Sequence, residues 1–328
     1  MSWPFFRGWF TDAGVKSKGK ILVIRGGAIG DFILTLPVLA ALRTQFPNAR
    51  LEVLGYPHIA SLALAGKLVD DVRSIEARPL AGFFARHGAL DAGLGQYFAN
   101  CALIVSYLYD PDEIFRTNVA RCSKAQFLAG PHRPSENARL HATEIFLQPL
   151  ERLAIFDPDR IPRLVISNAS DLEASRPWLA AHPGSGSEKK NWPEKQWASL
   201  LETLARETRF NLLLVGGEAE GERLNALSRL WPQNRLKLAQ SLPLPQLAGL
   251  LQHAAFFVGH DSGITHLAAA LGLPGLVLWG ESNLDVWRPQ SERMTILRDA
   301  RGLASLPASR VLAELAPALD RLNAGETY

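Results

Sequence analysis

Residues 20–25 read KILVIR, and the turn Gly26-Gly-Ala-Ile-Gly30 and then Asp31 follow at once. A short continuous apolar run is typical of a strand buried in a parallel sheet. The glycines allow a tight backbone turn after it, and Asp31 is a natural N-cap for an amphipathic helix that runs to about Phe46. Together these residues predict one strand–turn–helix unit of a doubly wound α/β sheet.

The same alternation continues on both sides of one interruption. Residues 156–175 are rich in Pro, Asp, Asn and Ser, which predicts a domain boundary. Further strands are predicted at 50–55, 72–76, 102–109, 178–182, 211–216, 256–259 and 276–279. Further helices are predicted at 57–68, at 141–153, from Pro193, after Gly217, at 262–271 and at 308–323. We therefore expect two doubly wound sheets, with a ligand cleft between the carboxyl ends of their strands.

Composition excludes several other classes of protein. The 328 residues are enough for about two domains. A 47% apolar share, 20% charged residues and a net charge of +3 exclude a disordered chain and disfavour a dedicated nucleic-acid binder. Cys101 and Cys122 are the two cysteines and form no CxxC pair, so structural zinc and a disulfide framework are disfavoured. No apolar run approaches the ~18 residues of a membrane span.

The N-terminal segment is aromatic and basic. Residues 2–10 read SWPFFRGWF, and Lys16, Lys18 and Lys20 follow. It lacks the apolar stretch and cleavage site of a signal peptide. Two interpretations remain: the rings lie at a lipid interface, or they pack on the body of the protein.

The first glycine turn does not identify a ligand by itself. A dinucleotide fingerprint would need glycine where Arg25 stands, and no acidic residue closes the second strand, since Glu52 lies inside it. No stretch supplies a P-loop either. Gly26, Gly27 and Gly30 therefore predict a tight turn and the close approach of another group.

Asp31 has two interpretations. It is a helix N-cap, or it is a general base that faces the cleft. A helix N-terminus weakens a carboxylate as a base, whereas desolvation by a bound substrate acts the other way.

Two loops in the second half favour phosphate binding. Residues 182–193 (HPGSGSEKKNWP) contain Ser185, Ser187 and Lys190 at the end of a strand. Such hydrogen-bond donors suit phosphate oxygens, which favours a phosphate site over a solvated loop with no ligand. Residues 259–266 (GHDSGITH) place Ser262 as a cap before the first amides of a helix, which is an anion site.

Three further features of residues 259–266 indicate which chemistry this loop supports. Gly263 and Ile264 supply the first amides, and His266 can add a hydrogen-bond donor or a positive charge. No His/Cys cluster with metal-ligand spacing lies nearby, so catalytic zinc is disfavoured. Asp261, Ser262 and His266 lack the G-x-S-x-G elbow of a hydrolase.

Three motifs occur in order: Gly30-Asp-Phe-Ile-Leu-Thr-Leu-Pro37, the 182–193 loop, and Gly259-His-Asp-Ser-Gly-Ile-Thr-His-Leu-Ala268. Together they resemble the ADP-heptose:lipopolysaccharide heptosyltransferases, family 9 of the glycosyltransferases, from Lys20 to about Arg288. The resemblance implies a GT-B fold, in which two Rossmann-like doubly wound domains face a central cleft. It also implies inverting, metal-independent transfer from a nucleotide sugar, typically ADP-heptose.

The resemblance also assigns roles by position. Asp31 corresponds to the catalytic base and Lys190 to a phosphate-contacting lysine. Asp261 corresponds to a residue near the donor sugar, and Glu222 to the acid that binds the ribose. The phosphate-binding helix start corresponds to Ser262, Gly263, Ile264 and His266. The sequence departs from the family pattern at 281–285, and residues 80–97, where acceptor contacts would lie, match no known motif.

These expectations define a complete prediction. The chain divides into an extension (1–19), an acceptor-side domain (20–165), a nucleotide-sugar domain (166–305) and a C-terminal helix (306–328) that packs back on the N-terminal domain. The enzyme transfers a sugar to a lipopolysaccharide-core or related lipid-linked or oligosaccharide acceptor, with no cofactor, metal or nucleic-acid partner. It resides in the cytoplasm, with weak association with the inner face of the inner membrane. The alternatives are a nucleotide-sugar 2-epimerase and a non-catalytic nucleotide-sugar-binding protein.

Overall fold

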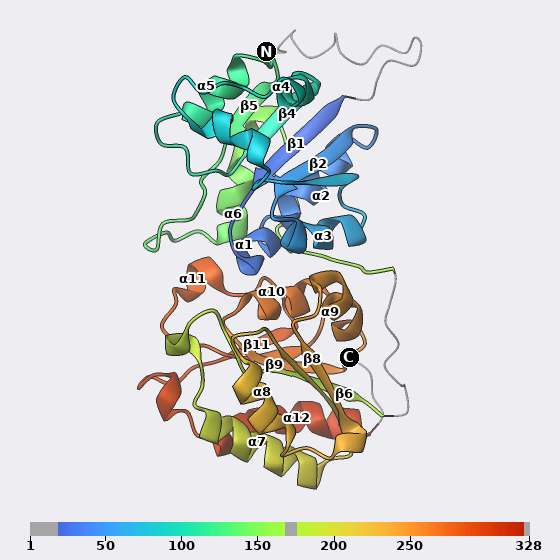
Figure 1. Ribbon diagram of the computed structural model, residues 1–328. Helices are drawn as coiled ribbons and strands as arrows, with labels where there is room; N and C mark the ends of the chain where they lie inside the picture. The colour runs from blue at the N-terminus through green and yellow to red at the C-terminus, as the bar shows by residue number, and fades with distance from the viewer. Residues whose placement is uncertain (1–18, 168–175, 325–328) are drawn as a thin grey trace.

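The computed structural model describes residues 19–167 and 176–324, and it contains two α/β bodies stacked one on the other (Figure 1). The first body has a five-stranded parallel sheet of order β3-β2-β1-β4-β5. Its strands are β1 (Lys20–Arg25), β2 (Arg50–Gly55), β3 (Asp71–Ser74), β4 (Cys101–Ser106) and β5 (Gln126–Ala129). Its helices are α1 (Ile29–Ile33), α2 (Leu36–Gln45), α3 (Pro57–Ala65), α4 (Ala92–Ala99), α5 (Ile114–Ala120) and α6 (Ala142–Leu147), with 3₁₀ turns at Arg78–Phe84 and Gln148–Leu153.

The second body has a six-stranded parallel sheet of order β11-β10-β9-β6-β7-β8. Its strands are β6 (Trp178–His182), β7 (Asn211–Gly216), β8 (Leu236–Gln240), β9 (Phe256–His260), β10 (Gly275–Leu278) and β11 (Met294–Leu297). Its helices are α7 (Glu194–Glu207), α8 (Gly221–Ser228), α9 (Leu244–Leu251), α10 (Gly263–Ala270), α11 (Leu284–Trp287) and α12 (Ala308–Asn323), with 3₁₀ turns at Glu188–Lys190, Gln233–Arg235 and Leu303–Ser305. The prediction of two doubly wound sheets is confirmed.

Burial explains which strands the sequence predicted. The central strands β1, β7 and β9 are buried along almost their whole length, so their apolar runs are continuous. The edge strands β5, β8 and β11 are partly exposed and were not predicted, whereas the fourth edge strand, β3, was predicted at 72–76. An edge strand has one neighbour and one open side, so its sequence carries a weaker apolar signal.

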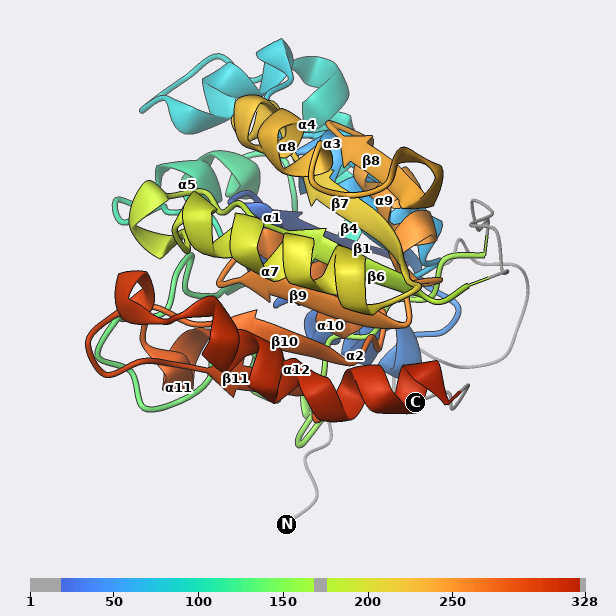
Figure 2. The same cartoon turned by 90° about the horizontal axis from the view of Figure 1, so that it is seen from below.

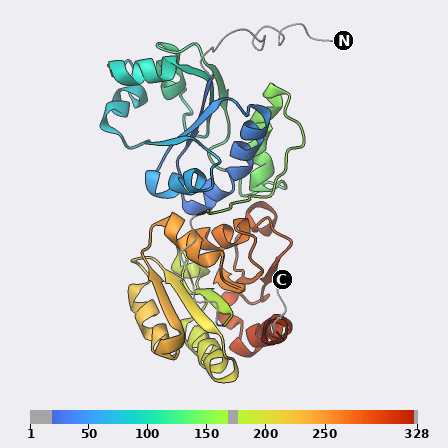
Figure 3. The same ribbon diagram turned by 90° about the vertical axis from the view of Figure 1, so that its right-hand side faces the viewer.

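The two bodies meet along a layer of helices (Figure 3). Helix α1 packs against α10, and α3 packs against α9. One apolar core runs through this layer and includes residues from both bodies, such as Leu34 and Leu247. The connecting segment joins the layer too, since the Leu164 amide donates to the Ala270 carbonyl (2.8 Å). His141 adds a polar contact, with its Nε2 2.8 Å from the Arg288 carbonyl oxygen.

The C-terminal helix corrects one prediction. We expected residues 306–328 to pack back on the N-terminal domain, but α12 lies beside α7 on the second body (Figure 2). Its buried side chains, including Val311 and Leu315, join a core built from the second sheet and α7. The Trp192 indole also donates to the Leu306 carbonyl (2.8 Å) just before the helix. The apolar face of α12 is therefore buried by its own sheet, which leaves none of that face for the other domain.

Three further predictions concern the N-terminal segment, the boundary between the domains and membrane spans. The aromatic segment 2–10 lies outside the described residues. The last element of the first body ends at Leu153, and the first strand of the second begins at Trp178. No helix within 19–167 or 176–324 is long and apolar enough to cross a membrane.

Candidate active site

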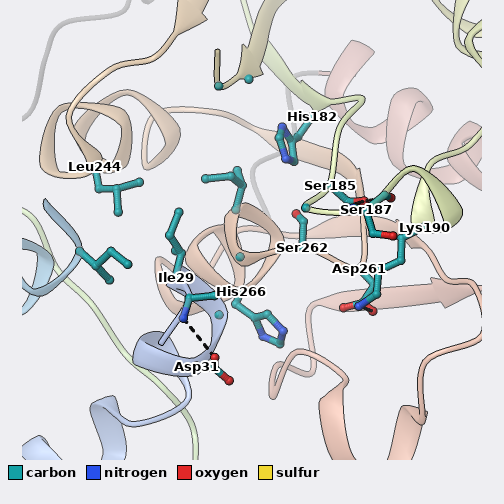
Figure 4. Close-up of a pocket in the computed structure, with 18 of the residues that line it drawn as sticks. Ile29, Asp31, His182, Ser185, Ser187, Lys190, Leu244, Asp261, Ser262 and His266 are labelled. Atoms are coloured by element: carbon teal, nitrogen blue, oxygen red, sulfur yellow. Dashed lines mark hydrogen bonds and ion pairs between the residues drawn. The ribbon is translucent and has the colours of Figure 1, made fainter. Parts of the chain in front are cut away.

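A cleft of about 990 Å³ lies between the carboxyl ends of the two sheets. Both bodies line it, and Figure 4 shows side chains from each facing the same space. Of the residues predicted from the sequence, those that line it are Gly30, Asp31, Ser185, Ser187, Lys190, Asp261, Ser262, Gly263, Ile264 and His266. Gly26, Gly27 and Glu222 do not line it.

The turn after β1 positions Asp31. Gly27 has φ +100°, and a Cβ there would lie 3.0 Å from Asp31 Oδ2, so both conformation and space require glycine. Helix α1 begins at Ile29, so Asp31 is its third residue and not the N-cap that we expected. Its Oδ2 accepts a hydrogen bond from the Ala28 amide (3.1 Å), which is the dashed line in Figure 4. The carboxylate therefore caps the helix from inside while its side chain stays 29% exposed.

Two glycines allow the domains to touch at this point. A Cβ on Gly263 would lie 2.7 Å from Ile29 Cβ and 3.0 Å from the Gly30 amide nitrogen. A Cβ on Gly30 would lie 3.2 Å from His266 Cδ2. Any side chain at position 263 would therefore push α1 and α10 apart. The absence of side chains brings Asp31 of one domain to the helix start of the other.

The start of α10 has free backbone amides that suit an anion. Ser262 is the N-cap, and its hydroxyl accepts from the Thr265 amide (3.3 Å). The amides of Gly263 and Ile264 are in the first turn, where an α-helix offers no internal acceptor. These groups and the helix dipole favour a negatively charged ligand in the cleft.

His266 contributes a neutral ring to this site. Burial lowers its pKa to about 4, although the negative charges of Asp261 and Asp31 act in the opposite direction. The ring is 6% exposed and is uncharged at neutral pH. Of the two roles that the sequence allowed for His266, the structure favours hydrogen-bond donation over a positive charge.

Lys190 supplies the cation of the site. Its ammonium lies 2.6 Å from Asp261 Oδ2, with the lysine side chain 41% exposed and the aspartate 8% exposed. Asp261 directly precedes the Ser262 cap, so the ion pair holds the lysine beside the start of α10 (Figure 4). A diphosphate bound there would find an ammonium group and helix amides together.

His260 fixes the loop that carries Lys190, and sequence analysis missed this role. Its Nε2 accepts from the Trp192 amide (3.0 Å) and the Trp197 indole (3.2 Å), so the proton resides on Nδ1, 3.3 Å from the Gly184 carbonyl. Burial lowers the pKa of His260 to about 3, which keeps the ring neutral. His260 immediately precedes Asp261, so its side chain connects the 182–193 loop to the 259–266 loop.

Glu220, two residues before the predicted Glu222, is the acid of this segment that lines the cleft. Glu222 is exposed and outside the cleft lining. Glu220 lines the cleft, and its Oε2 accepts from the Gly217 amide (2.8 Å). A Cβ on Gly184 would lie 2.4 Å from Glu220 Cγ, so glycine is required for this side chain to fit. The available signal was position: Glu220 is the acid just before α8, whereas Glu222 is inside it.

One end of the cleft is apolar. Its wall comes from four separate parts of the chain, so no single sequence motif announced it. The apolar lining residues at this end are Leu34, Ile59, Val215, Leu242, Leu244 and Leu247. An apolar wall in a cleft that also contains carboxylates suits a nucleoside, whose base is apolar on its faces and whose ribose carries hydroxyl groups.

A bridging loop, residues 130–141 between β5 and α6 of the first body, also lines the cleft and contacts the second body. The Glu136 carbonyl accepts from Asn283 Nδ2 (2.8 Å), and Glu136 Oε2 accepts from the Trp287 indole (3.3 Å). The Arg133 guanidinium lies 5.5 Å from the Trp287 ring centroid. Sequence analysis did not identify these residues, because their proximity depends on how the domains stack.

Comparison with known proteins agrees with this geometry. Residues 157–310 match the model of glycosyltransferase family 9 (heptosyltransferase). Lipopolysaccharide heptosyltransferase 2 of Escherichia coli (strain K12) is 26% identical over 320 residues, which cover 85% of this chain and 88% of that protein. The part of the chain that includes most of the second body thus matches glycosyltransferase family 9, and the chain is similar to a heptosyltransferase over most of its length.

Solved structures show the same fold. The E. coli ADP-heptose lps heptosyltransferase II has a TM-score of 0.74 at 19% identity, covering 93% of this chain and 99% of that one. The E. coli heptosyltransferase WaaC with ADP has a TM-score of 0.71 at 18% identity, covering 91% and 99%. The architecture is thus the GT-B type. The family match and the heptosyltransferase relatives support a glycosyltransferase enzyme, which disfavours the epimerase and binding-protein alternatives.

Proposed function

We propose that this enzyme transfers heptose from ADP-heptose to a lipopolysaccharide-core glycan, by an inverting, metal-independent displacement with Asp31 as the general base. The observation that carries the proposal is the position of Asp31 opposite the Lys190 and α10 anion site, across one cleft. A transferase needs a leaving-group site and a base on opposite sides of the reacting carbon. The cleft offers one from each domain.

The leaving group would be stabilised by fixed charges and dipoles. As the bond between the anomeric carbon and the ADP oxygen breaks, negative charge grows on the diphosphate. Lys190, the amides of Gly263 and Ile264, and a hydrogen bond from neutral His266 would stabilise that charge. The described residues hold no group of three or more His, Cys, Asp or Glu side chains suited to a metal ion.

The attacking hydroxyl would lose its proton to Asp31. The acceptor oxygen forms a bond to the anomeric carbon from the face opposite ADP, the proton moves to the Asp31 carboxylate, and ADP leaves as an anion. Inversion follows from this opposite-face attack. The bridging loop and the contact of α1 with α10 would exclude water, which limits hydrolysis of the donor.

The nucleoside would occupy the apolar end of the cleft. Glu220, which lines the cleft, would accept hydrogen bonds from the ribose hydroxyls, the role first assigned to Glu222. Ser185 and Ser187 would add hydroxyl donors to the diphosphate, and Asp261 would lie near the donor sugar. The identity of the sugar and base in the proposal rests on the family and on the heptosyltransferases to which the chain is similar.

The cellular location that we propose follows from the chemistry of the acceptor. A lipid-linked core glycan is made at the inner face of the inner membrane, so we place the enzyme in the cytoplasm with weak attachment to that surface. Deleting residues 2–10 is expected to lower binding to vesicles of anionic phospholipid without changing ADP binding. Equal vesicle binding by both proteins would favour rings packed on the protein body.

The function is tested by donor selectivity and product analysis together. ADP is expected to raise the melting temperature more than UDP or GDP at equal concentration. ADP-heptose with a series of lipopolysaccharides truncated in the inner core should release ADP with one of them, and the new linkage should have inverted anomeric configuration. Asp31→Asn keeps the size of the side chain and should lower transfer by about 10²–10⁴-fold with ADP binding intact.

Three results would contradict separate parts of the proposal. Equal thermal shifts with all three nucleotides would remove the ADP assignment. Retained configuration would remove direct displacement. Parent-level transfer by Asp31→Asn would remove the base.

A further inference from the structure

Arg25 occupies an unusual position for a cation. It is the last residue of β1 and stands where a dinucleotide-binding turn would have glycine. Its side chain is only 2% exposed, and its Nε is buried without a hydrogen-bond partner. Burying a charge is costly unless it is paired, so a buried arginine at the edge of an active site requires a reason.

The contacts of Arg25 converge on Asp31. Nη2 lies 3.8 Å from Asp31 Oδ1 and donates to the Asp31 backbone carbonyl (3.2 Å). Nη1 donates to the His132 carbonyl (2.7 Å) in the bridging loop, and the guanidinium lies 4.4 Å from the Phe146 ring centroid. Among the ion pairs of the described residues, Arg25 is paired with Asp31 alone. Burial lowers the pKa of Arg25, and the Asp31 carboxylate opposes that effect.

These contacts restrain both oxygens of the carboxylate. Oδ2 is held by the Ala28 amide, and Oδ1 is attracted by the Arg25 cation, so rotation of the carboxylate is opposed from two sides. Arg25 is itself held by a carbonyl of the bridging loop and one of α1. One planar, five-donor group therefore connects the proposed base to the bridging loop.

We infer that Arg25 is a positioning residue that orients the Asp31 carboxylate toward the acceptor hydroxyl and couples it to the bridging loop. The inference rests on the proposed role of Asp31. Arg25 does not touch substrate, so its loss should change the rate of transfer and leave donor binding unchanged.

The test is a double-mutant cycle with a matched control. Arg25→Met removes the cation and keeps a long side chain, and Arg43→Met is the control. Arg43 also binds two backbone carbonyls, those of Leu68 and Ala49, and one carboxylate, that of Asp70, but it is not among the residues that line the cleft. ADP release from ADP-heptose with truncated lipopolysaccharide gives kcat and KM for both substrates.

Arg25→Met should lower kcat by about 10- to 100-fold, as expected for a misplaced reacting group, with KM for ADP-heptose within about twofold of the parent. In the Asp31→Asn background, Arg25→Met should cause no further loss, because the group it positions has gone. Arg43→Met should lower the melting temperature and leave kcat at the parent value. Arg25→Lys, which keeps the charge and loses the fork, should have intermediate kcat, and it replaces Arg25→Met in the cycle if that variant does not fold.

The outcomes separate the inference from the function on which it rests. Losses that multiply in the double variant would show a general structural role and overturn the inference. So would parent-level kcat in Arg25→Met, or an equal loss in Arg43→Met. Parent-level kcat in Asp31→Asn would instead overturn the proposed base, and the role of Arg25 with it.

Discussion

A single methyl group at position 263 should separate the two halves of the active site. A Cβ there would lie 2.7 Å from Ile29 Cβ, whereas carbon atoms pack best at about 3.5–4.0 Å. Helices α1 and α10 would have to move apart by roughly 1 Å to restore that spacing. Alanine keeps the backbone amide and is a better helix former than glycine, so Gly263→Ala should not weaken α10 itself.

The expected effect is on catalysis. Asp31 lies two residues after Ile29, and a misplacement of about 1 Å can lower a rate by about 10²-fold, which is about 2.7 kcal/mol of transition-state stabilisation. We therefore expect kcat for ADP release in Gly263→Ala to fall by about 10²-fold. ADP affinity, measured by isothermal titration calorimetry, should stay within a fewfold of the parent, since the phosphate amides remain.

Two further alanine variants calibrate this result. A Cβ on Gly30 would meet His266 Cδ2 at 3.2 Å, a milder clash, so Gly30→Ala should lower kcat by less than Gly263→Ala. A Cβ on Gly280 would meet nothing within 4 Å, so Gly280→Ala should behave like the parent. The reasoning is refuted if Gly263→Ala turns over at the parent rate, or if the three variants lose activity equally.

Three other predictions follow from the site. Lys190→Ala removes a charge and should slow transfer by about 10²-fold or more. His266→Gln changes a neutral donor and should slow transfer by less, so equal losses in steady-state kcat would contradict this ranking. Glu220→Gln should weaken ADP binding in calorimetry, whereas Glu222→Gln should not, and the reverse result would restore Glu222. The pKa of His266 is about 4 in the folded protein and 6.5 in a free histidine. Between these pH values the unfolded chain binds more protons, so the free energy of unfolding falls as pH falls. The melting temperature of His266→Gln should therefore depend less on pH across that window, and an unchanged dependence would show that His266 does not contribute.

The sequence by itself determined the two sheets and the places where their ligand loops lie. The strands 20–25 and 178–182 are the same segments in the structure, since a strand buried on both faces must be apolar along its length. The motifs around Asp31, Lys190 and Ser262 line one cleft because each follows the carboxyl end of a strand, where a parallel sheet gathers its loops. Local chemistry was enough to find these residues.

Only the tertiary structure decided which groups meet and in what charge state. Whether Glu220 or Glu222 enters the cleft depends on where α8 begins, a difference of two residues that periodicity does not resolve. Which body α12 packs on depends on which sheet has an apolar face for it to cover. That face belongs to the second sheet, in the same body as α12. The neutral state of His266 arises from desolvation by distant parts of the chain, and burial by such parts also lowers the pKa of Arg25. Desolvation is a property of the whole surroundings in three dimensions, so neighbours along the sequence do not specify it.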